Sequence, residues 1–162
     1  MFYAFFALFL AVGLAILGYG VRSLLKSQQV EQWPTTWGTF EQRELVENSG
    51  SEGTTWRVAV LYRYRVAGVE HVSDRLAYGY AGTSARGTHQ AILDKLMRGD
   101  TVLVRYDRDD PGEAALVYGL NQSTIFLLMF GGVWTMFTLG LFSLFFLSSR
   151  PDTALLERLI VQ

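Results

Sequence analysis

The chain has 162 residues and a formal net charge of −1, from 14 Lys and Arg against 15 Asp and Glu, and it contains no cysteine. The absence of cysteine excludes disulfides, thiolate metal sites and a cysteine nucleophile. Between residues 22 and 122 charges of both signs are interspersed and nearly balanced, with no basic run of the kind that binds phosphate backbones. Nucleic acid is therefore not expected as a partner.

Two uncharged apolar runs bracket the chain, from Met1 to Val21 and from Ile125 to Leu147. A helix of about 20 apolar residues crosses the hydrocarbon core of a bilayer, so both runs are long enough to span it. The first run lacks the basic n-region, the short apolar stretch and the small-residue cleavage site of a secretory signal peptide. The sequence therefore predicts an integral, multi-pass membrane protein with two spanning helices.

A change in the spacing of apolar residues after Pro34 indicates strands. We expect a first strand over 37–47, a second over 54–66 and a third over 69–77. The second has the strictest alternation, with Trp56, Val58, Val60, Tyr62, Tyr64 and Val66 on one face and Arg57, Arg63 and Arg65 on the other. This alternation predicts a strand with one buried face and one face in water.

A glycine-rich loop over 78–87 precedes a predicted helix near 88–98. Thr88 is expected to cap this helix, and Ala91, Ile92, Leu96 and Met97 are expected to face inward. Strands over 101–106 and 114–118 follow, joined by a turn over 107–112. The order predicts a membrane α+β fold: two transmembrane helices flanking a small antiparallel β-sheet or partly open β-barrel with one short α-helix.

Four segments follow from this pattern. They are a first transmembrane helix with its juxtamembrane extension over 1–33, a β-rich soluble domain over 34–122, a second transmembrane helix over 123–149 and a short amphipathic tail over 150–162. In the tail, Leu155, Leu156, Leu159 and Ile160 share one helical face. Such a face suits an interfacial helix or a partner contact.

Several short motifs, in a fixed order between the two apolar runs, resemble a known family. They are Trp33-Pro34-Thr-Thr-Trp37-Gly38-Thr39, Tyr62-Arg-Tyr64-Arg-Val66-Ala-Gly68, Gly99-Asp-Thr-Val102-Leu-Val104-Arg-Tyr106-Asp107, Asp110-Pro111 and Ala114-Ala-Leu116. The chain resembles the bacterial membrane protein family known as domain of unknown function 3592. Arg108 departs from the Tyr-Asp-Pro that such proteins often have there. The resemblance implies a membrane-anchored β-rich module and no assigned catalytic residue.

Candidate chemistry in the soluble part is weak. Asp107, Asp109 and Asp110 lack the spacing of a calcium loop and suit a turn. Ser84 with His89 and an aspartate gives a hydrolase hypothesis, although no Gly-x-Ser-x-Gly motif surrounds the serine. We therefore predict no catalytic residue, no cofactor and no metal site.

Two groups of residues are candidates for contacts. Arg57, Arg63 and Arg65 are candidates for binding lipid headgroups or an acidic partner, against the alternative of pairing with Glu or Asp across the sheet. Small residues recur along both spans, which lets helices approach closely within the chain or between chains. The candidates for helix packing are Ala7, Ala11, Ala15, Gly18, Gly131, Gly132, Thr135 and Gly140.

Basic residues near the spans predict the orientation. Four of them, Arg22, Lys26, Arg105 and Arg108, lie on the side of the soluble domain, and Arg150 and Arg158 lie on the side of the termini. The positive-inside rule then favours the domain in the cytoplasm, with the chain in the inner membrane of a bacterium.

The leading hypothesis for function is a small non-enzymatic membrane protein that presents a β-rich module to membrane lipids and to another membrane protein or to itself. The alternative is a membrane-resident inhibitor or immunity-type protein directed against a toxin or another membrane protein. That alternative rests on architecture alone.

Overall fold

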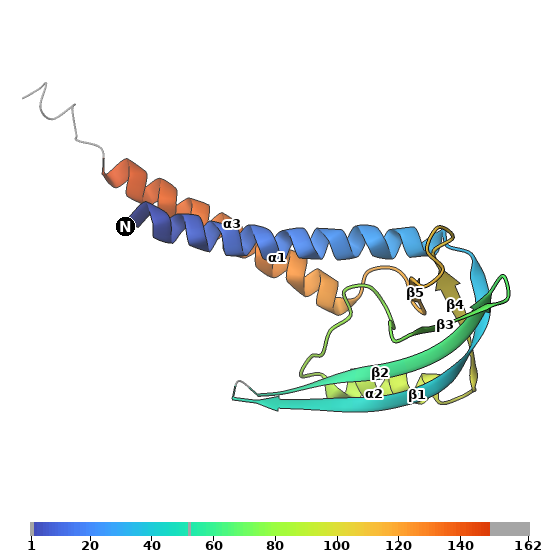
Figure 1. The fold of residues 1–162 in the computed structure, drawn as a ribbon. Coiled ribbons are helices and arrows are strands. Elements are labelled where there is room, and N and C mark those ends of the chain that lie inside the picture. Colours follow the sequence, from blue (N-terminus) through green and yellow to red (C-terminus); the bar gives the residue numbers. More distant parts are fainter. Residues whose placement is uncertain (1, 52, 150–162) are drawn as a thin grey trace, which may run out of the picture.

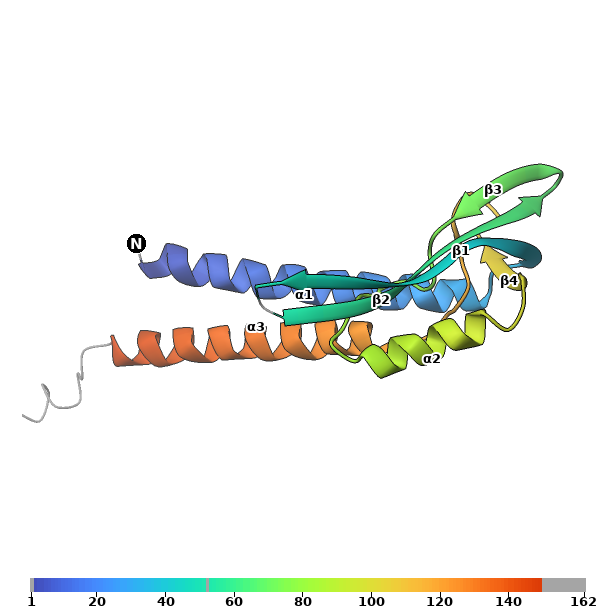
Figure 2. The ribbon, with the colours of Figure 1, turned by 90° about the horizontal axis from the view of Figure 1, so that it is seen from below.

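The computed structural model describes residues 2–51 and 53–149, and the predicted tail lies outside them. Two long helices dominate the architecture: α1 covers Phe2–Glu31 and α3 covers Gln122–Ser148. Both are long and apolar enough to cross a membrane. They lie side by side and antiparallel, with the β-rich domain at one end (Figures 1 and 2). The two predicted spanning helices and their placement around the domain are confirmed.

Glycines allow the two helices to pack closely. A Cβ on Gly131 would lie 2.8 Å from the backbone nitrogen of Leu17, and a Cβ on Gly20 would lie 3.1 Å from the side chain of Leu128. The indole Nε1 of Trp134 donates to the carbonyl oxygen of Phe9 at 2.9 Å. Lipid tails are as apolar as the helices, so close backbone approach and interhelical hydrogen bonds hold such a pair together.

The soluble domain is a five-stranded antiparallel sheet in the order β3-β2-β1-β4-β5. The strands are β1 (Thr35–Gly50), β2 (Gly53–Val66), β3 (Val69–Ser73), β4 (Thr101–Tyr106) and β5 (Ala114–Ala115). The sheet is open, so of the two predicted forms the antiparallel sheet is the one observed. One short helix, α2 (Arg86–Leu96), packs against β2 and β1.

The long β1–β2 hairpin contains one irregularity. Phe40 pairs with Tyr62 and Gln42 pairs with Leu61, so Glu41 is an extra residue in β1. Such a bulge reverses the face of every later side chain, which explains why the alternation of this strand is blurred in the sequence. The tip of the hairpin points toward the outer ends of the helices (Figures 1 and 2).

The core lies on one face of the sheet. As the alternation of β2 predicts, Val58, Val60, Tyr62 and Tyr64 are buried. The core is completed by Leu76, Val104 and Ala114, with Ile92, Leu93 and Leu96 of α2 packed against it. At about 25 cal/mol per Å² of apolar surface, burial of these side chains is the main stabilising term of the domain.

Three local predictions are wrong. Thr88 does not cap α2, because the helix begins two residues earlier and Ala85 accepts backbone hydrogen bonds from Thr88 and His89. Ala91 and Met97 are exposed, because the inward face of α2 is formed by residues 89, 92, 93 and 96. This spacing of three and four residues is that of one helical face.

The third and fifth strands are shorter than predicted. β3 ends at Ser73, where the chain leaves the sheet and the hydroxyl of Tyr62 donates to the carbonyl oxygen of Arg75 at 2.9 Å. β5 ends at Ala115, and the next two backbone N–H groups donate to the carbonyl oxygen of Leu76. In both cases the backbone finds a hydrogen-bond partner outside the ladder.

Candidate functional site

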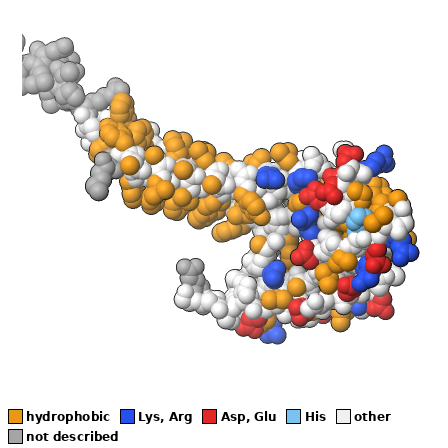
Figure 3. Space-filling model, in the orientation of Figure 1, with side chains coloured by type: hydrophobic (Ala, Val, Ile, Leu, Met, Phe, Trp, Pro, Cys, Tyr) orange, Lys and Arg blue, Asp and Glu red, His pale blue; other side chains and the backbone are white. Residues whose placement is uncertain are grey.

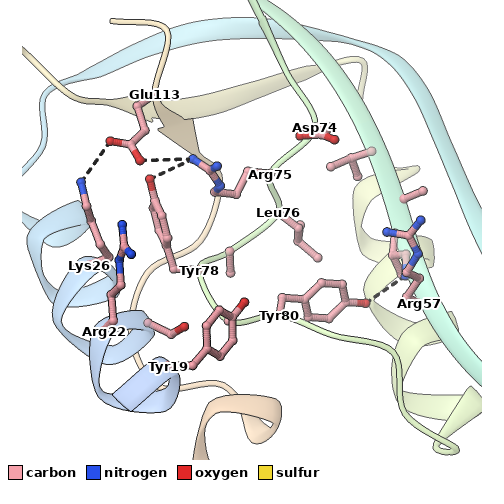
Figure 4. A pocket seen from close by; sticks show the side chains of 16 residues that line it. Tyr19, Arg22, Lys26, Arg57, Asp74, Arg75, Leu76, Tyr78, Tyr80 and Glu113 are labelled. Atoms are coloured by element: carbon pink, nitrogen blue, oxygen red, sulfur yellow. Dashed lines mark hydrogen bonds and ion pairs between the residues drawn. The ribbon is translucent and has the colours of Figure 1, made fainter. Parts of the chain in front are cut away.

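A polar cavity of about 460 Å³ lies where the helices meet the sheet. Its walls come from the last turns of α1, from β2, and from the segment that follows β3 (Figure 4). The polar side chains that line it include those of Tyr19, Arg22, Lys26, Asp74, Arg75, Tyr78 and Glu113. Cavities lined by a few convergent polar groups are the usual form of a ligand site, so this one is the candidate site.

Glu113 connects the two sides of the cavity. Its Oε2 accepts from the Nζ of Lys26 at 3.0 Å, and its Oε1 lies 3.7 Å from the Nη1 of Arg75. The same Nη1 donates to the hydroxyl of Tyr78 at 2.9 Å. Figure 4 shows these side chains converging from α1 and from the segment after β3. The network therefore ties the first spanning helix to the domain.

The carboxyl group of Glu113 is held ionised. A hydrogen bond from Tyr78 is the largest cause that lowers its pKa, and Lys26 and Arg75 lower it further against the opposing effect of burial. Burial, followed by the contact with Glu113, raises the pKa of the Tyr78 hydroxyl. The cavity therefore contains a carboxylate and a neutral phenol at neutral pH.

The cationic groups exceed the anionic ones. Arg22, Lys26, Arg57 and Arg75 line the cavity against Asp74 and Glu113. Among the residues that the structure describes, Arg22 forms no ion pair or hydrogen bond through its side chain. Its guanidinium lies beside Lys26 in the cavity (Figure 4). The site is thus suited to a negatively charged group.

Polar contacts fix the helices against the domain around this cavity. Ser27 donates to the carbonyl oxygen of Gly119 at 2.8 Å, and Arg105 donates to that of Glu31 at 3.0 Å. Asn121, the N-cap of α3, donates to the carbonyl oxygen of Tyr78 at 2.7 Å and accepts from the backbone of Thr124. The walls of the cavity are therefore held in place from both spanning helices.

The three arginines predicted as contact residues are not grouped in one site. Arg63 pairs with Glu41 and Glu70, and Arg65 lies 3.6 Å from Glu70. The hydrogen bond that Arg63 donates to Glu41 and the charges of both carboxylates raise the pKa of Arg63. Arg57 lies nearer the start of β2 and lines the cavity. Arg63 and Arg65 therefore pair with glutamates across the sheet, and these ion pairs are at the surface.

The small residues of the spans fall on two different faces. Gly131 packs against α1, and the hydroxyl of Thr135 donates to the carbonyl oxygen of Gly131 at 2.7 Å. Gly18, Gly132 and Gly140 have no neighbour within 4 Å of an added Cβ. The alanines of the predicted stripe, Ala7, Ala11 and Ala15, are exposed. The glycine in α1 that meets α3 most closely is Gly13, which is outside the predicted set.

The residues of the hydrolase hypothesis do not form a nucleophile–base pair. His89 is buried, and its ring nitrogens contact the Tyr80 hydroxyl at 2.7 Å and Thr83 Oγ1 at 2.8 Å. Ser84 is exposed. In the acidic turn, Asp107 and Asp110 accept hydrogen bonds from the backbone nitrogens of residues 109 and 112, as expected of a turn. Within residues 2–51 and 53–149, no cluster of three or more acidic or histidine residues forms a metal site.

Comparison with protein families gives a match over the β-rich part of the chain. The family model described as "Domain of unknown function (DUF3592)" matches residues 36–121, which is more than half of the chain. The chain belongs to this family. The match covers α2 and the sheet except for Thr35 at the start of β1, and it confirms the resemblance predicted from the motifs. No curated protein matches the chain.

The cavity could not be predicted from the sequence, because the residues that line it are far apart along the chain. Lys26 and Glu113 are separated by 87 residues. The only local signal is that Arg22 and Lys26 lie four residues apart, on one face of the polar extension of α1. Their convergence on Arg75 and Glu113 depends on how the domain folds back on the helix, which no local pattern indicates.

Proposed function

We propose that the protein is a non-enzymatic membrane module that acts by binding another membrane helix, in a second copy of the chain or in a different membrane protein. The observation that carries the proposal is the unused small-residue face of α1. Ala7, Ala11, Ala15 and Gly18 are exposed, whereas Gly13 and Gly20 are buried against α3. At 100° per residue the two sets lie on opposite faces of the helix.

The face is suited to a helix partner. Small side chains let a second backbone approach closely in the bilayer, where van der Waals packing drives association. Because α3 packs on the other face of α1, this face stays exposed among the residues that the structure describes. Figure 3 shows apolar side chains along the helix pair and charged side chains on the domain and its junction with the helices. The bilayer is therefore where this face is presented.

The experiment compares Ala11→Leu with the matched control Val12→Leu. Full-length chains carrying donor and acceptor fluorophores are reconstituted into vesicles, and energy transfer reports association between copies. We expect Ala11→Leu to weaken association by about 1–3 kcal/mol, the usual cost of overpacking a close contact. Val12 is on a neighbouring face, so its variant is expected to associate like the wild type. For a partner of a different kind, the same variants are compared by co-purification from native membranes. The proposal is contradicted if the wild type, Ala11→Leu and Val12→Leu associate equally in both assays.

We further propose that the domain faces the cytoplasm of a bacterium, from the basic residues near the spans. The chain has no cysteine, so a single cysteine placed at Asp109, in the exposed turn between β4 and β5, reports the side of the domain without background. Protection from a membrane-impermeant maleimide in intact cells, and labelling after lysis, is the expected result. Labelling in intact cells contradicts the proposed orientation.

A further inference from the structure

The polar cavity has an unusual position relative to the bilayer. Arg22 is the first charged residue after the apolar run of α1, and Lys26 follows one helical turn later. Tyr19, whose side chain is exposed and also lines the cavity, lies at the end of the apolar run, where aromatic residues are enriched at membrane interfaces. The cavity is therefore placed at the level of the lipid headgroups.

The charged side chains around the cavity indicate which kind of ligand it can bind. Three cationic side chains, those of Arg22, Lys26 and Arg75, gather around the single carboxylate of Glu113 (Figure 4). Asp74 lies beyond Arg75 from the two residues of α1. Arginine presents a planar fork of donors that matches the oxygens of a phosphate.

Arg22 is the donor that remains available. Lys26 and Arg75 already contact Glu113, whereas the Arg22 guanidinium has no partner among the described residues and lies in the same cavity. The walls around it are held by hydrogen bonds from Ser27 and Asn121, so the shape of the cavity is set before a ligand binds. Such preorganisation lowers the entropy lost on binding.

We propose that this cavity binds a phosphate group, with Arg22 as the main donor and Lys26, Arg75 and the Tyr78 hydroxyl around it. The group belongs either to the headgroup of an anionic phospholipid or to a soluble phosphate-bearing molecule. The cavity is formed within one chain, so binding there does not require the helix association proposed above.

The experiment uses the full-length protein in a neutral detergent. In the lipid arm, native mass spectrometry measures retention of phosphatidylglycerol against phosphatidylcholine. In the soluble arm, the Tm is measured in sodium phosphate and in sodium chloride of equal ionic strength. The variants are Arg22→Gln and Arg75→Gln. The matched control is Arg65→Gln, which removes a cation that lies outside the cavity and is 69% exposed.

With a lipid headgroup as ligand, the wild type retains phosphatidylglycerol in preference to phosphatidylcholine. Arg22→Gln and Arg75→Gln then reduce this retention by about five-fold each, as expected for one juxtamembrane cation. With a soluble ligand, phosphate raises the Tm of the wild type and not that of Arg22→Gln. Either pattern supports the site, provided that Arg65→Gln behaves like the wild type.

Two results overturn the proposal. One is that neither lipid nor phosphate distinguishes the wild type from Arg22→Gln. The other is that Arg65→Gln loses as much binding as Arg22→Gln, because the attraction is then a property of the whole surface. Arg75→Gln also removes a contact to Glu113, so its folding is checked by its Tm without ligand. Arg22 has no described partner to lose, and its variant is expected to unfold at the wild-type temperature.

Discussion

At the scale of single residues, both ring nitrogens of His89 take part in hydrogen bonds. Nδ1 lies 2.7 Å from the Tyr80 hydroxyl, which accepts from the backbone nitrogen of Val58 at 2.9 Å. Nε2 lies 2.8 Å from Thr83 Oγ1, which accepts from the backbone nitrogen of Ala85 at 3.3 Å. The neutral ring has one donor and one acceptor, and each hydroxyl can take either role. A neutral imidazole thereby fixes the loop before α2 to β2.

Protonation of His89 should therefore destabilise the domain. Burial lowers the pKa of His89 below its ordinary value, so the neutral form is favoured in the folded state. Its stabilising contribution is complete above the unfolded pKa of about 6.5 and is lost as the pH falls through that value toward the folded pKa. We expect the Tm of the wild type to fall between about pH 7 and pH 5, and that of His89→Gln to fall less. Parallel pH profiles for the two proteins would show that another group is responsible.

At the scale of elements, the sequence predicts which segments form better than it predicts which faces meet. The strict alternation of β2 and the apolar runs of α1 and α3 each predict one element, and all three are observed. The faces of α1 are different, because a helix that is apolar all round has no periodic signal to show which side packs on a neighbour. Likewise, no local pattern shows that β1 pairs with β4, because β2, β3 and α2 lie between these two strands in the sequence. The bulge at Glu41 has the same origin, since it depends on the partner strand.

The glycines of the helix pair allow a test of the observed packing. Gly131→Leu places a side chain against the backbone of Leu17, whereas a side chain at the adjacent Gly132 has no neighbour within 4 Å. We expect Gly131→Leu to lower the free energy of unfolding by about 1–3 kcal/mol, as overpacking usually does. Gly132→Leu is expected to change it by less than about 0.5 kcal/mol. Unfolding in detergent by heat or denaturant measures both, and equal effects would contradict the packing.

At the scale of the whole molecule, side-chain hydrogen bonds join the domain to the two long apolar helices. Lys26, Ser27, Arg105 and Asn121 connect the two parts by side-chain hydrogen bonds. The hairpin points toward the outer ends of the helices and lies apart from them (Figures 1 and 2). The candidate cavity consists of residues from both parts, so neither apolar run serves only as an anchor. This joint surface could not be read from the sequence, because its parts are brought together only by the tertiary fold.

The proposed function places the outward face of α1 against another membrane helix, in a second copy of the chain or in a different membrane protein. A photo-crosslinking amino acid at position 11 of the full-length protein, activated in native membranes, tests it most directly. The matched position is 13, where Gly13 faces Trp134 and Thr135 of α3. We predict protein adducts between chains from position 11 and crosslinks within the chain from position 13. Lipid adducts alone from position 11, with position 13 reacting within the chain, would contradict the claim.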